Sequence, residues 1–305
     1  MRKRTITTAL AILALGAAGA SAEVVQQFGF TIKDVHADGR YTVVFDSRSY
    51  DSDGQTPALL LSNTIRLPKG AVIRRQFRKS RYYCDLKKLV DRLRTDHPNA
   101  SHFNDLVNQT VRGKRTVPRR ASDLIAVCRF AHVGGGTALI DARPYVEQPI
   151  PAHFEMFWAK PTRGAVATMA VVGSADDSTP VVAENAAIRN THPVLSVDFV
   201  DDPTPDGLYE YKLVLPTGPI AGINVSFAEV HAVTKGLTLT KRTAKCVRKK
   251  GRRCARRKVR KTNLFWFTRP TCPPSGRLSF QAWYVYASAP PQARTIEIPC
   301  PKFEG

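Results

Sequence analysis

Thirteen basic residues and no acidic residue lie within residues 241–261. The whole chain has a formal net charge of +21, so the residues outside this stretch together carry only +8. Charge concentrated in this way attracts polyanions and releases their bound counterions. The basic residues are Lys241, Arg242, Lys245, Arg248, Lys249, Lys250, Arg252, Arg253, Arg256, Arg257, Lys258, Arg260 and Lys261.

We expect this stretch to form a hairpin extension with Gly251 at its tip, and we predict a polyanion-binding site on it. The stretch has no aromatic residue and little apolar surface, which argues against base stacking and against insertion into a bilayer. A solvated loop without a dedicated partner is the alternative, because charge alone predicts only non-specific binding. The predicted contacts are Arg248, Lys249, Lys250, Arg252, Arg253, Arg256, Arg257, Lys258, Arg260 and Lys261.

Residues 1–22 have the pattern of a secretory signal peptide. Three basic residues at 2–4 precede an apolar run at 6–19, and Ala-Ser-Ala at 20–22 fits cleavage before Glu23. The run is short for a membrane span, although an uncleaved anchor is the alternative, and no later stretch reaches transmembrane length. We therefore expect a secreted or envelope-associated protein. The polyanions available there are anionic wall polymer, anionic lipid headgroups and extracellular DNA.

Six cysteines in an exported chain predict disulfides. Sequence order suggests three pairs, although six cysteines allow 15 pairings. A metal site would need closely spaced cysteine pairs or histidines at ligand spacing, and neither is present, so we expect no metal and no cofactor. The suggested pairs are Cys84 with Cys128, Cys246 with Cys254, and Cys272 with Cys300.

Other polar residues are candidates for chemistry, but ordinary structural roles explain them better. Carboxylates at 201, 202 and 206, and at 176 and 177, could cleave glycosides or bind calcium, yet Asp is also a common turn residue. Gly134–Gly136 lack the following helix of a phosphate-binding loop, which favours a turn or bulge. The three tryptophans could stack on sugars if exposed, but their strand context favours burial. We predict no catalytic residue.

The elements that position these residues are strands. Between residues 277 and 288 the apolar residues alternate with a period of two, which predicts a central strand with Leu278, Phe280, Ala282, Tyr284 and Tyr286 on one face. Further strands are predicted at 264–267 and 295–298.

About a dozen short strands separated by turn residues predict an all-β fold, mainly an antiparallel sandwich of one or two packed lobes. Strands are expected at 124–130 and 181–188 among others, and a polar loop at 47–55. One helical segment is expected at about 85–111, because apolar residues recur at helical spacing from Leu86 to Leu93. The β-rich body then covers 23–240, with the cationic loop at 241–261 and final strands at 262–305.

Several turns and cysteines stand out along the chain, at Leu67–Gly70, Gly135–Ala138, Pro151–Ala152, Tyr209–Pro216, Pro270–Pro273 and Ile298–Pro301. They are similar to those of a group of exported β-rich actinobacterial proteins with paired cysteines. The resemblance covers most of the chain after residue 22 and implies a secreted β-rich body with the two outer disulfides, but no catalytic residues. The chain departs from the group in its longer Cys84–Cys128 loop and its longer basic turn with two extra cysteines.

Three functions remain from the sequence. The first is a non-catalytic envelope or extracellular protein that binds anionic polymers through residues 241–261. The second is a secreted hydrolase acting on polysaccharide, and the third is a structural surface domain without a ligand. We expect the first, and therefore a protein that is not an enzyme.

Overall fold

The structure is a computed structural model that describes residues 24–33, 41–51, 59–70, 83–85, 125, 128–143, 146–176, 178–184, 188, 193–215, 225–235, 239–250, 253–264 and 270–302. From 235 to 264, side chains are described only at 244–247 and 259. The predicted leader at 1–22 and nearly all of the helical segment predicted at 85–111 lie outside these residues, and Asp85 has no regular secondary structure.

The all-β, antiparallel class predicted from the sequence is confirmed. Strands make up nearly all of the described regular structure, with one four-residue helix. In chain order the elements are β1 (Val24–Lys33), β2 (Thr42–Asp51), β3 (Leu60–Pro68), β4 (His132–Asp141), β5 (Ile150–Ala159), β6 (Ala167–Ala175), α3 (Pro180–Ala183), β7 (Val194–Asp201), β8 (Tyr209–Leu215), β9 (Ser226–Lys235), β10 (Leu239–Lys250), β11 (Arg253–Leu264), β12 (Arg277–Tyr286) and β13 (Gln292–Pro299).

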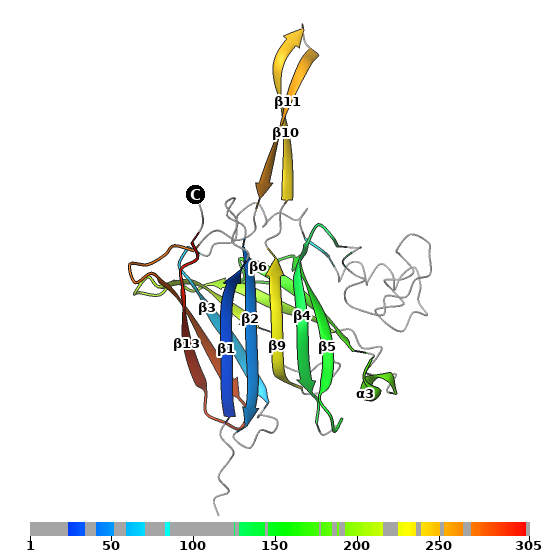
Figure 1. The fold of residues 1–305 in the computed structure, drawn as a ribbon, viewed down its shortest axis with the longest axis vertical. Helices are drawn as coiled ribbons and strands as arrows, with labels where there is room; N and C mark the ends of the chain where they lie inside the picture. The colour runs from blue at the N-terminus through cyan, green and yellow to red at the C-terminus, as the bar shows by residue number, and fades with distance from the viewer. Residues whose placement is uncertain are drawn as a thin grey trace, which may run out of the picture.

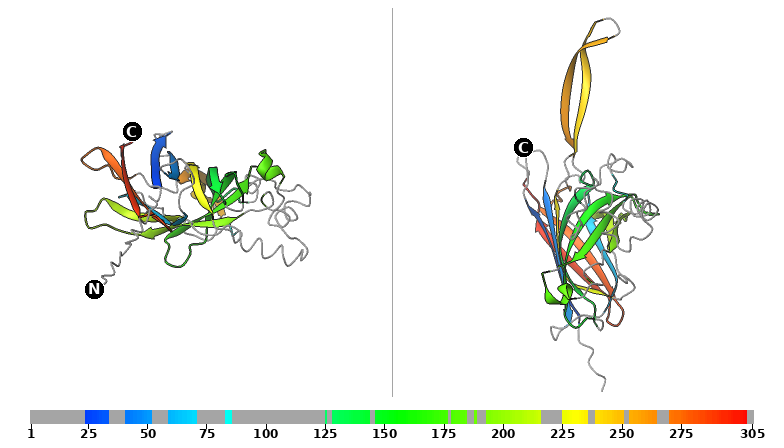
Figure 2. Two further views of the ribbon diagram at one scale, coloured as in Figure 1. Left: turned by 90° about the horizontal axis from the view of Figure 1, so that it is seen from below. Right: turned by 90° about the vertical axis from the view of Figure 1, so that its right-hand side faces the viewer.

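Eleven strands form one continuous sheet in the order β1-β2-β9-β4-β5-β6-β7-β8-β3-β12-β13, and every neighbouring pair is antiparallel. The sheet curls until its two edges approach each other, so both facing layers of the body belong to the same sheet (Figures 1 and 2). Strands β10 and β11 form a separate two-stranded sheet.

The edge strands β1 and β13 are joined by side chains. Because an odd number of strands alternate in direction, the first and last strands run the same way, and an antiparallel ladder cannot close the sheet. The Gln292 side-chain amide donates to the Val24 carbonyl, and Arg294 Nε donates to the Gln26 carbonyl at 3.2 Å. These bonds satisfy part of an edge that would otherwise present unpaired carbonyl groups.

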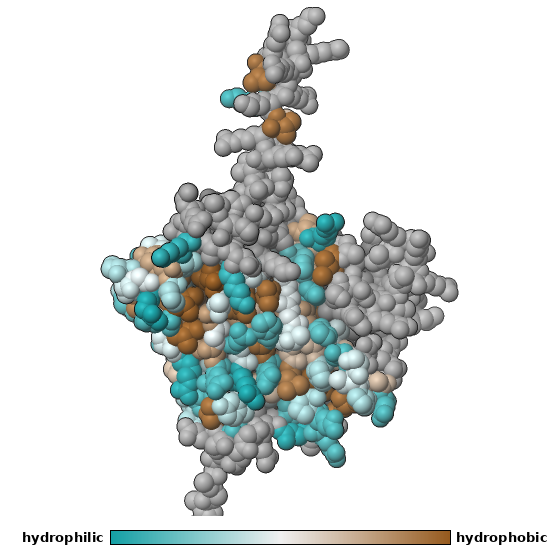
Figure 3. Space-filling model, in the orientation of Figure 1, coloured by the Kyte–Doolittle hydropathy of each residue, from teal (hydrophilic) through white to brown (hydrophobic). Residues whose placement is uncertain are grey.

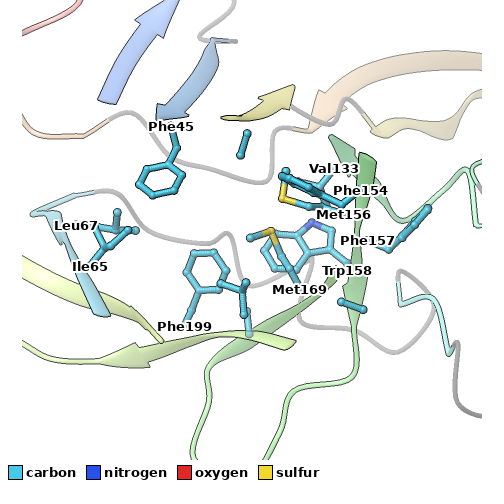
Figure 4. Packing of buried hydrophobic residues seen from close by; sticks show 14 of the residues in the cluster. Phe45, Ile65, Leu67, Val133, Phe154, Met156, Phe157, Trp158, Met169 and Phe199 are labelled. Carbon is cyan, nitrogen blue, oxygen red and sulfur yellow. The ribbon is translucent and has the colours of Figure 1, made fainter. Parts of the chain in front are cut away.

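The main hydrophobic core lies inside the curled sheet. Figure 4 shows Phe45, Ile65, Met169 and Phe199 directed into a common interior from different strands. Phe30 on β1 stacks on Phe280 on β12, with ring centroids 4.4 Å apart, so the core also bridges the unpaired edge.

Strand β12 has the alternation predicted from its sequence. Leu278, Phe280, Ala282, Tyr284 and Tyr286 are all buried. The strand pairs with β3 on one side and β13 on the other, which confirms that it is not at an edge. It therefore contributes a nearly continuous row of large side chains to the core.

The Cys84–Cys128 disulfide confirms one predicted pair, and both cysteines are buried in the main core next to the end of β5. The backbone N–H of Cys84 donates to the carbonyl of Trp158 at 2.7 Å, and the N–H of Trp158 donates to the carbonyl of Ala131 at 2.8 Å. Trp158 is 1% exposed, as its strand context predicted.

Two predicted strands are wrong. At 124–130 the described residues form turns, and the N–H of Ala131 donates to the carbonyl of Cys128 at 2.8 Å, so the chain reverses just before β4. At 181–188 the chain begins with helix α3, because Pro180 occupies its first turn and the N–H of Ala183 donates to the carbonyl of Thr179.

The polar loop predicted at 47–55 is wrong for residues 47–51, which belong to β2. Register with β1 satisfies their backbone groups, from Ser47 opposite Phe28 to Asp51 opposite Val24. Ser49 is buried and shares a hydrogen bond with the hydroxyl of Tyr286 at 3.2 Å, so its polarity does not mark a loop.

Candidate functional site

The predicted cationic site lies on the β10–β11 hairpin, which projects from one end of the body (Figures 1 and 2). Its strands pair antiparallel from Leu239 opposite Leu264 to Lys250 opposite Arg253. The basic residues of 241–250 extend over about 33 Å at 3.3 Å per residue. Together with those of 253–261 they place roughly one positive charge every 2.8 Å of hairpin, a spacing comparable to the one phosphate per 1.7 Å of duplex DNA.

Both faces of the hairpin are open to solvent where its side chains are described. Neighbouring strand residues point to opposite faces, and Ala244 and Lys245 are both exposed. Val247 is 56% exposed and Val259 is 55% exposed. Hydrophobic groups on the projecting hairpin are visible in Figure 3. The hairpin therefore does not bury either face against the body at this level.

The register places basic residues directly opposite basic residues at four positions of the hairpin. Like charges in direct cross-strand positions disfavour pairing. This arrangement is unfavourable in isolation and becomes less so when an anion supplies counter-charge. The four pairs are Arg242 with Lys261, Lys245 with Lys258, Arg248 with Arg256, and Lys250 with Arg253.

The predicted site residues are divided between the two strands. Arg252 and Gly251 lie outside the described residues, and the other predicted contacts are placed by backbone register alone. Strand β10 carries Arg248, Lys249 and Lys250, and strand β11 carries Arg253, Arg256, Arg257, Lys258, Arg260 and Lys261.

The hairpin also carries two cysteines. Cys246 is disulfide-bonded and half-buried. It lies opposite Arg257, whereas Cys254 lies opposite Lys249, so the two cysteines are not direct cross-strand neighbours. A register irregularity separates these two positions. The predicted pairing of Cys246 with Cys254 stays a prediction, because the Cys254 side chain lies outside the described residues.

The Cys272–Cys300 disulfide is confirmed, and it connects the turn before β12 to the end of β13. The N–H of Cys300 donates to the carbonyl of Gly276 at 2.9 Å, and the N–H of Thr271 donates to the carbonyl of Lys69 at 3.0 Å. This staple anchors the chain where it returns from the hairpin to the sheet.

Three of the carboxylates considered for hydrolysis have structural partners. Asp202 accepts from Arg66 at 2.7 Å and lies 3.8 Å from Lys212. Hydrogen bonds from the Thr204 hydroxyl and from the N–H of Leu208 lower the pKa of Asp206, as expected for a turn carboxylate. Bonds from Ser178 and from His153 lower the pKa of Asp176. Each of these three already has donors that hold a turn or strand in place.

Three histidines each contact one carboxylate. His132 lies 2.7 Å from Glu155, His153 lies 3.2 Å from Asp176, and His231 lies 2.6 Å from Asp46. In the part of the chain that the structure describes, no three His, Cys, Asp or Glu residues gather as metal ligands.

The glycines at 134–136 lie inside β4, next to a register irregularity between His132 and Gly134. They permit close strand packing: a Cβ at Gly136 would overlap the carbonyl oxygen of His231, and a Cβ at Gly134 would overlap that of Val233. Close strand packing therefore accounts for these glycines, and no bound phosphate is needed to explain them.

Trp283, unlike Trp158, is only half-buried. The Arg66 guanidinium lies over its ring, 4.5 Å from the ring centroid.

A cavity of about 210 Å³ that the sequence did not predict lies inside the curled sheet. Ten strands line it, from β1 to β9 and β12, so no short segment predicts it. No Asp, Glu, Lys or Arg is among the described residues that line it. The sequence features that could have indicated this cavity are polar residues at inward-facing positions of otherwise apolar strands, notably Gln26, Asn63 and Tyr284.

No protein-family model, curated protein or solved structure matches the chain. Within the described residues, no helix has the length and apolar character needed to span a membrane.

Proposed function

We propose that this chain is an exported, non-catalytic protein of the cell envelope or extracellular space that binds phosphate-bearing anionic polymers through its β10–β11 hairpin. The carrying observation is a ribbon with thirteen basic residues and no acid at 241–261 that pairs only with itself in the described structure. Such a ribbon presents charge away from a body that is close to neutral.

Three kinds of ligand share the required chemistry. Teichoic wall polymers, anionic lipid headgroups and extracellular DNA all present phosphates that Arg and Lys contact through charge-assisted hydrogen bonds. The hairpin offers no aromatic platform, so we expect recognition of charge spacing rather than of bases. Two exposed valines give too little apolar surface for insertion into a bilayer.

Export is supported by the leader pattern at 1–22 and by two disulfides in the body. Disulfides persist in oxidising compartments. Mass spectrometry of the protein from culture medium and cell envelope should find a chain that begins at Glu23. A cytoplasmic chain that begins at Met1 would contradict export.

The test of the binding site measures affinity as a function of salt for wall polymer, anionic vesicles and duplex DNA. The hairpin variant replaces Arg248, Lys249, Arg256 and Arg257 by Gln. On DNA, the slope of log K against log salt should become less steep by up to about 3.6, because each phosphate that the protein neutralises contributes about 0.9 to the slope.

The matched control removes four exposed basic residues from the body, Arg129, Lys160, Arg163 and Lys302, by substitution with Gln. Both variants lower the net charge by the same amount. If the hairpin binds polyanions, only the hairpin variant changes the slope strongly. Equal losses of affinity in the two variants would contradict the proposal, because they would mean that total charge decides binding.

A further inference from the structure

The interior cavity has a polar end. Gln26, Ser47, Asn63 and Tyr284 line it there, among apolar residues such as Phe30. Tyr284 is 0% exposed and Asn63 is 7% exposed. They lie directly opposite each other on β12 and β3, so their positions are set by sheet register.

Most polar groups around this end already have partners. The Tyr286 hydroxyl donates to Gln26 Oε1 at 2.8 Å, and Gln26 Nε2 donates to Ser47 Oγ at 3.0 Å and to the Gln27 carbonyl at 2.8 Å. The network therefore satisfies the Gln26 amide and fixes its orientation.

Two buried polar atoms at this end of the cavity do not take part in the hydrogen-bond network. Asn63 Oδ1 and Tyr284 Oη are buried without a hydrogen-bond partner among the described residues. Ser47 and Gln26 lie near enough to the Tyr284 phenol to offset part of the pKa rise that burial causes, but neither completes a hydrogen bond of standard geometry with Oη. Buried polar atoms without partners are uncommon in folded proteins, because each has lost its bonds to water.

We propose that the cavity is a binding site for a small uncharged molecule with an apolar body and one hydroxyl group, of the phenol or short alkanol class. A hydroxyl both donates and accepts, so it can donate to Asn63 Oδ1 and accept from Tyr284 Oη. No Asp, Glu, Lys or Arg is among the described lining residues, and His153, which also lines the cavity, is exposed and already contacts Asp176 at 3.2 Å. A carboxylate or an amine at the polar end would therefore be buried unpaired.

The volume sets the ligand size. An apolar protein cavity of about 150 Å³ accommodates benzene, so about 210 Å³ fits an aromatic ring with a short alkyl chain. Figure 4 shows the apolar walls that would surround such a body, with Phe45, Met156, Met169 and Phe199 on different sides. This site is separate from the hairpin and does not depend on the function proposed for it.

The experiment is isothermal titration of the oxidised full chain with three probes: 4-propylphenol, propylbenzene and 4-propylbenzoate. The phenol should bind roughly five- to tenfold more tightly than propylbenzene, which corresponds to one or two net hydrogen bonds. The benzoate should show no binding. The proposal is overturned if neither 4-propylphenol nor propylbenzene binds, or if all three probes bind with equal affinity.

Variants assign the polar contacts. Tyr284→Phe and Asn63→Leu should each remove most of the advantage of the phenol over propylbenzene, while propylbenzene affinity stays within about twofold. Tyr209→Phe is the matched control, because Tyr209 is a buried tyrosine outside the cavity lining whose hydroxyl bonds Ser279 Oγ at 2.7 Å. If Tyr284→Phe still binds 4-propylphenol more tightly than propylbenzene by the full factor, then water and not the ligand hydroxyl pairs with these two atoms. That result would overturn the proposed hydrogen bonds to the ligand.

A filling variant tests the location. Val197→Phe extends a buried lining residue into the cavity and should abolish binding of both uncharged probes while the protein remains folded by circular dichroism. If that variant unfolds, Ala232→Val makes a smaller change to the cavity lining, on strand β9, and should weaken the binding of both probes. Unchanged affinity in a folded filling variant places the ligand elsewhere and overturns the proposal.

Discussion

Phe30 on the first strand stacks on Phe280 on the twelfth, with their rings 4.4 Å apart and tilted by 9°. The stack joins two strands that are not hydrogen-bonded to each other, across the edge that the backbone ladder does not close. Side-chain packing, with the bonds from Gln292 and Arg294, therefore holds the curled sheet together at its seam.

Phe280→Ala should lower the free energy of unfolding by about 3–5 kcal/mol, because it removes a buried ring and leaves a cavity at the seam. Urea denaturation of the oxidised protein measures this difference. Phe130→Ala is the control: Phe130 is 46% exposed, and its removal should cost well under 1 kcal/mol. A similar destabilisation in both variants would mean that the seam does not depend on the stack.

Gly136→Ala should destabilise the protein by more than 2 kcal/mol, because the new Cβ would overlap the carbonyl oxygen of His231 on the paired strand. Gly29→Ala is a matched strand glycine whose Cβ would meet only the Asp46 Cβ, at 4.0 Å. That variant should keep or slightly raise stability, because alanine lowers the entropy of the unfolded chain. The melting temperatures of the two variants measure this difference. An equal loss of stability in both would mean that strand glycines in general do not tolerate alanine, and not that Gly136 is needed for close packing.

Loss of the Cys272–Cys300 disulfide should lower stability by about 3–4 kcal/mol, as chain entropy predicts for a loop of 28 residues. The variant is the double substitution Cys272→Ala and Cys300→Ala, compared by denaturant unfolding. The double substitution Cys246→Ser and Cys254→Ser should leave the unfolding of the body unchanged, since the hairpin forms a sheet of its own. A large destabilisation in the second variant would show that the hairpin is coupled to the body.

Stability should fall as the pH rises above about 10, the pKa of a tyrosine in the unfolded chain. Burial raises the pKa of Tyr284 and of Tyr286 in the folded protein. The folded state then holds these protons more tightly than the unfolded state, so their contribution is complete below pH 10 and disappears as the pH rises through the raised pKa values.

Urea unfolding between about pH 8 and pH 11 measures this dependence. In the variant Tyr284→Phe and Tyr286→Phe the decline should be shallower, and the absorbance of phenolate should show fewer tyrosines that ionise only on unfolding. An identical slope in this variant and in the wild type would rule out these two residues as its source.

Local pattern in the sequence determined the strand class, the buried face of β12 and the concentration of charge at 241–261. Each of these depends on residues that are neighbours in the chain, so period and composition report them directly. The Cys272–Cys300 pair also followed from chain order, because its two cysteines flank one strand hairpin.

Tertiary structure alone decided which strands pair, how the sheet curls and where Asn63 and Tyr284 meet. Periodicity identifies the two faces of a strand but does not name its neighbour, which long-range packing selects. Long-range packing also explains why residues 47–51 form a strand despite their polarity. Ser49 forms a hydrogen bond with Tyr286, a residue that is distant in the sequence. The cavity needs ten strands at once, and no window of the chain contains that information.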